Sequence, residues 1–325
     1  MDQKVNILIK SHIGIFSLLN FIFNDILKMV VKMIIGSHVN FQSDQLLGCA
    51  KQAVSYGANT FMFYTGAPQN TIRKSISDEL LVEANKYMAE NNIDINNVIC
   101  HAPYIINLAN REKEDSWNFS ISFLRQEIAR ITKMGVNYIV LHPGNALQMD
   151  RMDALHNIAD ALNFVITNDT KPMILLETMA GKGTECGINT YEIKEIIEHV
   201  NLKEKIGVCL DTCHLNDSGI DIAKFDEYLD EFDQIIGLEK VKCIHLNDSK
   251  NVIGSHKDRH ANLGYGTIGF DNLINVLYNP KLKDVPKILE TPWIGEYPPY
   301  KFEIDMIKTK TFNPNLESDL KEYYK

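Results

Sequence analysis

The residues best suited to chemistry in this 325-residue chain are histidines and carboxylates at the ends of apolar runs. Seven of eight such runs end in one or more of these side chains: His38, His101, His142, Glu177, Asp211 with His214, His245 and Glu290. A polar segment, HKDRHANLG, adds Asp258 and His260. A polar strand cap explains any one position, but not the same placement at seven ends. Imidazoles and carboxylates brought together repel or neutralise each other unless a cation holds them, so the pattern indicates metal binding.

The kind and number of metal ions follow from the ligand types. Five imidazoles and four carboxylates remain when His38, which we expect to pack under the site, is set aside. Histidine and carboxylate ligands without a CxxC pair favour zinc over manganese or iron. Asp258 and His260 are two residues apart, so an extended segment would direct both to one side. Because a catalytic zinc ion takes about three protein ligands, nine ligands indicate a cluster that shares a carboxylate.

The apolar runs themselves predict the elements that position these side chains. They cover residues 33–39, 60–66, 98–105, 138–144, 173–179, 206–214, 241–248 and 287–292. Near-continuous apolar runs are typical of parallel strands buried on both faces. Amphipathic stretches at 44–57, 78–92, 117–135, 153–168 and 189–200 predict helices between them. Eight strand–helix repeats predict a single-domain (β/α)8 barrel over residues 33–325, whose strand carboxyl ends meet at one face.

Composition limits the class of protein without deciding its partner. Hydrophobic residues make up 45% of the chain and charged residues 23%, as in soluble globular proteins. The net charge of -9 is a weak argument against a nucleic-acid partner, because each bound divalent cation adds two positive charges in the site. None of the six cysteines forms a CxxC pair, and three lie in apolar runs. Free buried thiols and an intracellular, reducing compartment are therefore expected.

Residues 1–32 need a separate interpretation. Their apolar stretch is interrupted by Asn20, Asn24 and Asp25, so it is too broken for a membrane span of about 20 apolar residues. It also has no A-x-A-like cleavage site for a signal peptide. We expect an N-terminal extension of unknown role, either an amphipathic helix or the product of an upstream start codon, with Met33 as a candidate functional start.

The motifs around the candidate ligands resemble a known family. IIGSHV, FMFYTGAPQNT, HAPYIINL, VLHPG, LLETMAGKGTECG, DTCH, HLNDSK, KDRHANLGYGTIG and ILETP follow one another from Met33 almost to the C-terminus. In this order they resemble the motifs of the endonuclease IV family of apurinic/apyrimidinic endonucleases. The resemblance implies a (β/α)8 barrel with three Zn²⁺ ions, some replaceable by manganese or iron. It implies three ligand sets: His101, His142 and Glu177; Glu177, Asp211, His245 and Glu290; and His214, Asp258 and His260.

The resemblance also implies a reaction. A water held between two zinc ions loses its proton near neutral pH and attacks the phosphorus 5' to an abasic site, while the third ion stabilises the departing 3' oxygen. Glu177, Asp211 and Glu290 are the implied catalytic carboxylates. The products are a 3'-hydroxyl and a 5'-deoxyribose phosphate, formed during base excision repair. The implied partner is double-stranded DNA with abasic sites or 3' blocking groups, bound by a monomer with no membrane contact.

Candidate DNA contacts come from the loops after the strands. Gln69, Tyr104 and Ile105 stand where members of the family push side chains into the base stack, although some relatives have arginine in place of Gln69. Nearby basic residues could meet phosphates: Arg73, Lys74, Lys182, Lys250, Lys257 and Arg259. For any single one of these, a solvated surface charge is the commoner role.

Two other functions fit part of the pattern. A sugar isomerase or epimerase of the xylose-isomerase-like barrels would use Glu177, Asp211, His245 and Glu290 alone, leaving five candidate ligands without a role. A non-catalytic damage-binding protein with structural zinc would need closed, four-coordinate sites, whereas these sets hold three or four ligands with one shared.

The remaining motifs predict loops rather than sites. GYGTIG has the spacing of a dinucleotide motif but does not follow a strand, so it predicts a tight turn beside the third zinc. The pentapeptide HLNDS occurs twice, at 214–218 and 245–249. Its histidines are candidate ligands of different ions, and Asp217 and Asp248 are expected to organise loops.

Overall fold

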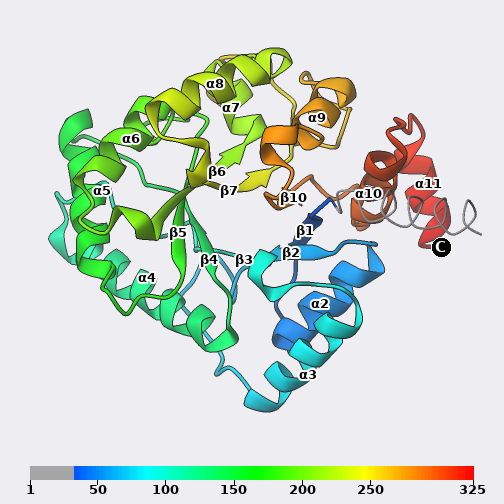
Figure 1. Ribbon diagram of the computed structural model, residues 1–325, viewed down its shortest axis with the longest axis horizontal. Helices are drawn as coiled ribbons and strands as arrows, with labels where there is room; N and C mark the ends of the chain where they lie inside the picture. Colours follow the sequence, from blue (N-terminus) through cyan, green and yellow to red (C-terminus); the bar gives the residue numbers. More distant parts are fainter. Residues whose placement is uncertain (1–32) are drawn as a thin grey trace, which may run out of the picture. The chain divides into compact units, whose positions relative to one another are not determined.

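The computed structural model describes residues 33–325, so the expectations for residues 1–32 lie outside it. Eight parallel strands form a closed barrel in the order β1-β10-β7-β6-β5-β4-β3-β2, which confirms the predicted fold (Figure 1). Their bounds are β1 (Ile35–Val39), β2 (Thr60–Phe63), β3 (Ile99–His101), β4 (Tyr138–Leu141), β5 (Met173–Glu177), β6 (Ile206–Asp211), β7 (Val241–His245) and β10 (Lys287–Leu289). A separate antiparallel pair, β8 (Asp248–Ser249) and β9 (His260–Ala261), lies in the long loop after β7.

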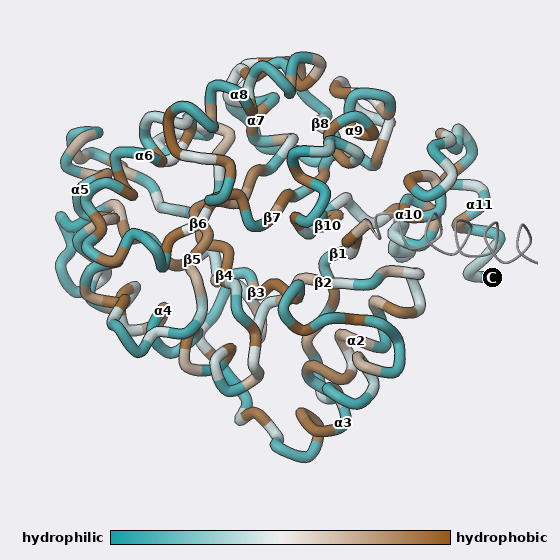
Figure 2. Tube along the Cα trace, in the orientation of Figure 1, coloured by the Kyte–Doolittle hydropathy of each residue, from teal (hydrophilic) through white to brown (hydrophobic). Residues whose placement is uncertain are grey.

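Helices surround the barrel, and the five predicted ones are present with shifted ends. Their bounds are α2 (Gln45–Ser55), α3 (Asp78–Glu90), α4 (Glu114–Met134), α5 (Arg151–Val165), α6 (Thr190–His199), α7 (Thr212–Ser218), α8 (Phe225–Ile235), α9 (Phe270–Leu277), α10 (Tyr300–Thr309) and α11 (Leu316–Tyr323). Figure 2 shows hydrophobic residues along the strands and many hydrophilic residues on the outer helices. Ile34–Lys325 forms one compact unit.

One layer of the barrel interior places the candidate ligands. Seven buried residues, one from each of seven strands, pack together there: Met62, Ile99, Val140, Leu175, Cys209, Cys243 and Ile288. Side chains two positions apart on a strand point to the same side. Two positions beyond six of these residues stand His101, His142, Glu177, Asp211, His245 and Glu290. The ligands are therefore the next inward-facing layer, at the carboxyl end of the barrel.

The sixth strand is shorter than its apolar run. β6 ends at Asp211, and helix α7 begins at the next residue rather than at the end of the run at residue 214. The Asp211 side chain caps this helix by accepting a hydrogen bond from the His214 N–H over 2.8 Å. Capping by an aspartate satisfies a backbone donor that a continued strand would have paired. His214 therefore projects from the first turn of a helix.

Two further findings concern the residues that the structure describes. The six cysteines are all free and buried. Within the described part of the chain, no helix is long and apolar enough to cross a membrane.

Candidate metal centre

Glu177, at the end of β5, contacts histidines with both of its carboxylate oxygens. Its side chain is buried, and Oε2 lies 3.1 Å from the Nε2 atoms of both His101 and His142. The rings of these two histidines meet edge to face with centroids 5.0 Å apart. The two histidines of the first implied ligand set thus contact the same oxygen of its third member, Glu177.

The second oxygen of Glu177 faces the second ligand set. Oε1 lies 2.9 Å from Nδ1 of His245, and the same nitrogen lies 2.8 Å from Oε2 of Glu290. Asp211 Oδ2 is 3.7 Å from it. A single ring nitrogen carries at most one proton and cannot satisfy three carboxylates, so this cluster of negative charge can accept a cation.

The third set lies beside Asp211. Asp258 Oδ1 is 3.1 Å from His214 Nε2 and 3.5 Å from His260 Nε2. His260 Nε2 is also 3.8 Å from Asp211 Oδ2. Asp258 and His260 do point to the same place, but the simple extended segment we expected is wrong, because Asp258 has a left-handed backbone with φ of 53°.

Backbone carbonyls orient two of these imidazoles. His101 Nδ1 lies 2.8 Å from the Ala102 carbonyl oxygen, and His214 Nδ1 lies 2.9 Å from that of Thr178. A carbonyl only accepts, so each Nδ1 donates and the neutral ring keeps a lone pair on Nε2. That lone pair then faces a carboxylate oxygen, which is also an acceptor. A metal ion resolves this conflict between acceptors, so these residues fit a bound metal ion.

Protons resolve the same conflict when no cation is bound. Burial lowers the pKa of His142, but the charge and hydrogen bond of Glu177 outweigh it and leave that pKa raised. Burial likewise lowers the pKa of His214, yet Asp211 and Asp258 contribute to raising it well above its usual value. The carboxylates therefore favour positive charge at this end of the barrel, as protons or as metal ions.

Asn247, which the sequence did not single out, holds two of the carboxylate positions. Its Nδ2 donates to Asp211 Oδ2 over 2.7 Å, and its Oδ1 accepts from the Glu290 N–H over 2.9 Å. Its position two residues after His245 follows the strand alternation and is the signal that could have found it.

His38 is linked to the site by the ring of Tyr64, which lies between His38 and His101. Its ring packs on Tyr64 at 5.0 Å, and Tyr64 packs on His101 at 5.0 Å. Burial, opposed by the charge of Glu290, lowers the pKa of His38 to about 4. A neutral His38 with a buried, unpaired Nε2 agrees with our expectation that it packs under the ligands.

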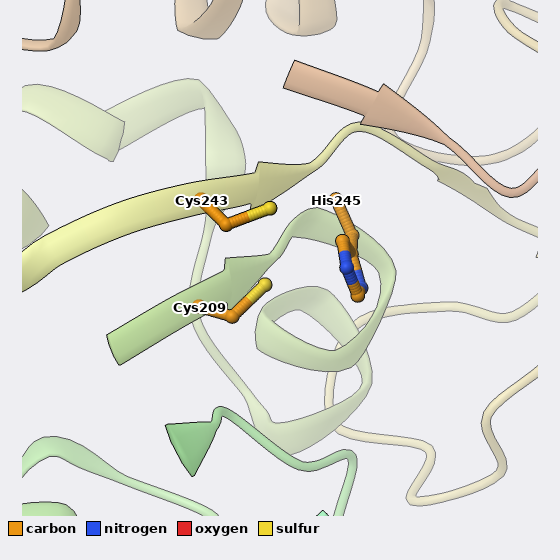
Figure 3. A group of neighbouring side chains, drawn as sticks. All are labelled: Cys209, Cys243 and His245. Carbon is orange, nitrogen blue, oxygen red and sulfur yellow. The ribbon is translucent and has the colours of Figure 1, made fainter. Parts of the chain in front are cut away.

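Two buried thiols lie in the barrel layer next to His245. Cys209 and Cys243 are register partners on β6 and β7. Figure 3 shows their sulfur atoms turned to the side on which His245 stands, and the sulfur atoms and a ring nitrogen lie within 4.8 Å of one another. Both belong to the apolar layer that fills the barrel, which accounts for their burial.

The two aspartates of the repeated pentapeptide organise loops, as expected. Asp217 accepts hydrogen bonds from Ser249 Oγ over 2.6 Å and Asn251 Nδ2 over 2.9 Å. Asp248 accepts the backbone N–H groups of Gly264, Gly266 and Ile268 over 3.0–3.1 Å. The glycine-rich GYGTIG is thus a turn wrapped around a buried carboxylate, and a Cβ at Gly266 would lie 2.3 Å from Asp248 Oδ1.

The candidate DNA contacts follow strands at the ligand-bearing end of the barrel. Tyr104 is 54% exposed and Ile105 is half-buried. The other exposed residues of this group are Gln69, Lys74, Lys182, Lys250, Lys257 and Arg259. They lie on the loops that follow β2, β3, β5 and β7.

Arg73 does not belong with these exposed cations. Its Nε donates to Glu127 Oε1 over 2.8 Å, and its guanidinium packs over the Phe123 ring at 5.0 Å. Its Nη1 also donates to the carbonyls of Asn70 and Ile72. The expectation that Arg73 could meet phosphates is wrong, because these contacts occupy the side chain in holding the β2–α3 loop.

Comparison with known proteins shows the family of this chain. Residues 50–310 match the family described as xylose isomerase-like TIM barrel. The chain is 50% identical over 292 residues to a probable endonuclease 4 of Enterococcus faecalis, covering 87% of this chain and 97% of that protein. It is 49% identical over 289 residues to a probable endonuclease 4 of Bacillus subtilis, with the same coverage of each. The chain belongs to the endonuclease IV family.

Solved structures agree with this family and show how widely its barrel is shared. Endonuclease IV from Thermus thermophilus superposes with a TM-score of 0.73 at 28% identity, covering 85% of this chain and 97% of that one. A D-tagatose 3-epimerase-like protein superposes with a TM-score of 0.63 at 16% identity, covering 89% of this chain and all of that one. The second likeness shows the fold alone, so membership of the endonuclease IV family decides against the sugar isomerase.

Proposed function

We propose that this member of the endonuclease IV family is a DNA repair endonuclease that cleaves the phosphodiester bond 5' to abasic sites. The observation that carries the proposal is the double contact of Glu177, whose two oxygens join the His101 and His142 pair to His245. A sugar isomerase needs only the second of these groups. The endonuclease 4 relatives, about half identical over most of the chain, support the same reaction.

The residues support three Zn²⁺ sites, with manganese or iron able to replace zinc in part. The proposed ligand sets are His101, His142 and Glu177; Glu177, Asp211, His245 and Glu290; and His214, Asp258 and His260. When bound, the ions supply a water of lowered pKa and positive charge for the phosphate oxygens. Glu177 is proposed as the shared ligand because it is the one carboxylate with both oxygens in contact with histidines of different sets.

One carboxylate of the site is suited to accept a proton during the reaction. Among the three proposed catalytic carboxylates, Glu290 is the most accessible to an entering substrate, because it is 16% exposed while Glu177 and Asp211 are at most 1% exposed. It is placed to accept the proton of the attacking water. The water oxygen bonds to phosphorus and the bond between phosphorus and the 3' oxygen breaks. The departing 3' oxygen takes up a proton from Glu290 or from solvent, which leaves a 3'-hydroxyl and a 5'-deoxyribose phosphate.

DNA binding is proposed for the loops around the ligands. Tyr104 and Ile105 supply an apolar wedge after β3, and Gln69 lies on the neighbouring loop after β2. Inserted side chains stabilise an opened stack at a missing base. The exposed cations Lys182, Lys257 and Arg259 would meet the phosphate backbone, which offsets the overall charge of -9 locally.

The compartment, oligomeric state and domain division of the enzyme are also part of the proposal. Free buried thiols support an intracellular enzyme, and we propose that it works as a monomer. We also propose that residues 33–325 form the whole catalytic domain and that residues 1–32 are an extension to it. A protein starting at Met33 with the specific activity of the full chain would support this division.

A single assay tests the function. The protein is incubated with a duplex that carries one abasic analogue, before and after metal depletion, and zinc per chain is measured by elemental analysis. We expect incision 5' to the analogue, about three zinc ions per chain, and loss of incision on depletion. A zinc-replete sample that leaves the duplex intact would overturn the proposal. Two metals per chain together with interconversion of a ketose and an aldose would establish the isomerase instead.

A further inference from the structure

A second group of potential metal ligands lies away from the barrel face, on two neighbouring outer helices. His156 is on α5, and Glu195 and His199 stand four residues apart on α6 (Figure 1). Residues four apart share one face of a helix. The three side chains are 42%, 32% and 47% exposed, so ions in solution can reach them. None of the nine ligands of the candidate metal centre takes part.

Both imidazoles of this group contact one carboxylate oxygen. His156 Nε2 lies 2.9 Å from Glu195 Oε1, and His199 Nδ1 lies 3.4 Å from the same oxygen. The two rings are 4.2 Å apart between centroids, with a tilt of 40°. The two rings and the carboxylate thus converge at one place on the surface. A neutral ring is the form that binds a metal ion.

The orientation of His199 agrees with a role as a ligand. His199 Nδ1 lies 2.9 Å from the backbone carbonyl oxygen of Glu195. Because the carbonyl accepts the Nδ1–H, the lone pair of the neutral ring is on Nε2, with no partner among the described residues. Metal-ligating histidines usually donate their other ring N–H to a carbonyl or carboxylate in this way. One ligand atom from each of the three residues falls within 4.8 Å of the others.

We propose that His156, Glu195 and His199 form a peripheral Zn²⁺ site that links α5 to α6. Two imidazoles and one carboxylate are ligands that zinc accepts, and water completes its coordination. The ion takes the place of the hydrogen bond between His156 and Glu195 and adds positive charge to a chain of net charge -9. An ion bound by both helices stabilises the folded protein, since it binds the folded chain and not the separated ligands. This proposal is independent of the reaction at the barrel face.

The experiment compares zinc binding by matched variants of the zinc-replete protein. Excess zinc is removed by dialysis without a chelator, and ZnCl2 is then titrated in by calorimetry while the unfolding temperature is followed. We expect one further Zn²⁺ per wild-type chain and a rise in unfolding temperature. His156→Ala, His199→Ala and Glu195→Gln should each weaken this binding about tenfold or more. MgCl2, whose ion prefers oxygen ligands, should give no such signal.

A neighbouring acid supplies the control. Glu198→Gln removes the same charge from the same helix, but Glu198 pairs with Lys203 over 2.6 Å rather than with the histidines. It should bind the additional zinc as the wild type does, and all four variants should keep wild-type incision of abasic DNA. Equal zinc uptake by the wild type and by His156→Ala and His199→Ala would overturn the site. So would an equal loss of binding in Glu195→Gln and Glu198→Gln.

Discussion

Asp217 accepts a hydrogen bond from the backbone N–H of Asp258 over 2.9 Å. Asp217 belongs to the first HLNDS, whereas Asp258 lies in the loop that follows the second. The same carboxylate is fully buried and also holds Ser249 and Asn251. The first pentapeptide thus supplies a ligand, His214, and an anchor for the loop that carries the other ligands of the third set. The two HLNDS segments therefore have different, complementary roles around one site.

The first prediction tests this anchor. Asp217→Asn places an amide nitrogen among groups that donate, so part of the hydrogen bonding is lost and Asp258 is less well held. We expect metal affinity at the third set to fall by about 10–100-fold. Zinc content after dialysis against graded chelator measures the change. Asp221→Asn, at an exposed helix cap, should leave zinc content unaltered, and a fully retained third ion in Asp217→Asn would contradict the anchoring role.

Much of this arrangement could be predicted because strands impose a strict alternation. His101, Glu177 and His245 end their runs two positions beyond a buried apolar residue, so a correct barrel places them on one inner layer. The sequence could not predict features that depend on loop backbone or on pairing between distant segments. The left-handed Asp258 and the contact of Arg73 with Glu127 are of this kind.

The second prediction concerns the most accessible carboxylate of the second ligand set. Glu290→Gln keeps the volume of the side chain and should leave the fold intact, but it removes a charge 2.8 Å from His245. Loss of a proton acceptor and metal ligand should lower the turnover of abasic duplex by about two orders of magnitude or more. Glu296→Gln, an exposed acid in the same loop after β10, should cut at the wild-type rate. Wild-type turnover by Glu290→Gln would remove Glu290 from the site.

The third prediction concerns protons released by metal binding. The raised pKa values of His142 and His214 mean that these rings keep their protons to a higher pH than an ordinary imidazole when metal is absent. Zinc needs the neutral ring, so its binding must expel protons and its affinity must rise with pH. Titration of metal-depleted protein in buffers of different ionisation enthalpy should show net proton release. Zinc binding without proton release near pH 7 would contradict the raised pKa values of these rings.

The fourth prediction tests the proposed wedge. Tyr104→Ala removes an exposed ring from the loop after β3 and should leave the unfolding temperature unaltered. Binding to a duplex with an abasic analogue should weaken by about 1–3 kcal/mol, the usual worth of a stacked aromatic ring. Fluorescence anisotropy measures the affinity. Tyr191→Ala, which removes a 64% exposed ring from outer helix α6, should bind DNA as the wild type does. Equal effects of the two variants would exclude a specific wedge.

The fifth prediction concerns stability and Lys287, a buried lysine at the start of β10. It is 1% exposed, and burial lowers its pKa to about 8, although its Nζ donates to the Leu282 carbonyl. A lysine whose pKa is lower when folded destabilises the protein below that pKa, and the cost disappears as the pH rises from about 8 toward 10.5. The lowered pKa corresponds to a loss of about 3 kcal/mol in the free energy of unfolding. Replacing the lysine with an apolar residue would remove this loss, but it would leave the Leu282 carbonyl without its donor, at a cost of about 1 to 3 kcal/mol.

Lys287→Met should therefore be as stable as the wild type or up to about 2 kcal/mol more stable at pH 7. Denaturant unfolding at pH 7 and pH 9.5 measures this difference. The wild type should gain on the variant as the pH rises, because only the wild type loses an unfavourable buried charge. Lys283→Met, at an exposed position four residues earlier, should show no pH-dependent difference from the wild type. A constant difference between Lys287→Met and the wild type at both pH values would mean that Lys287 does not titrate in this range.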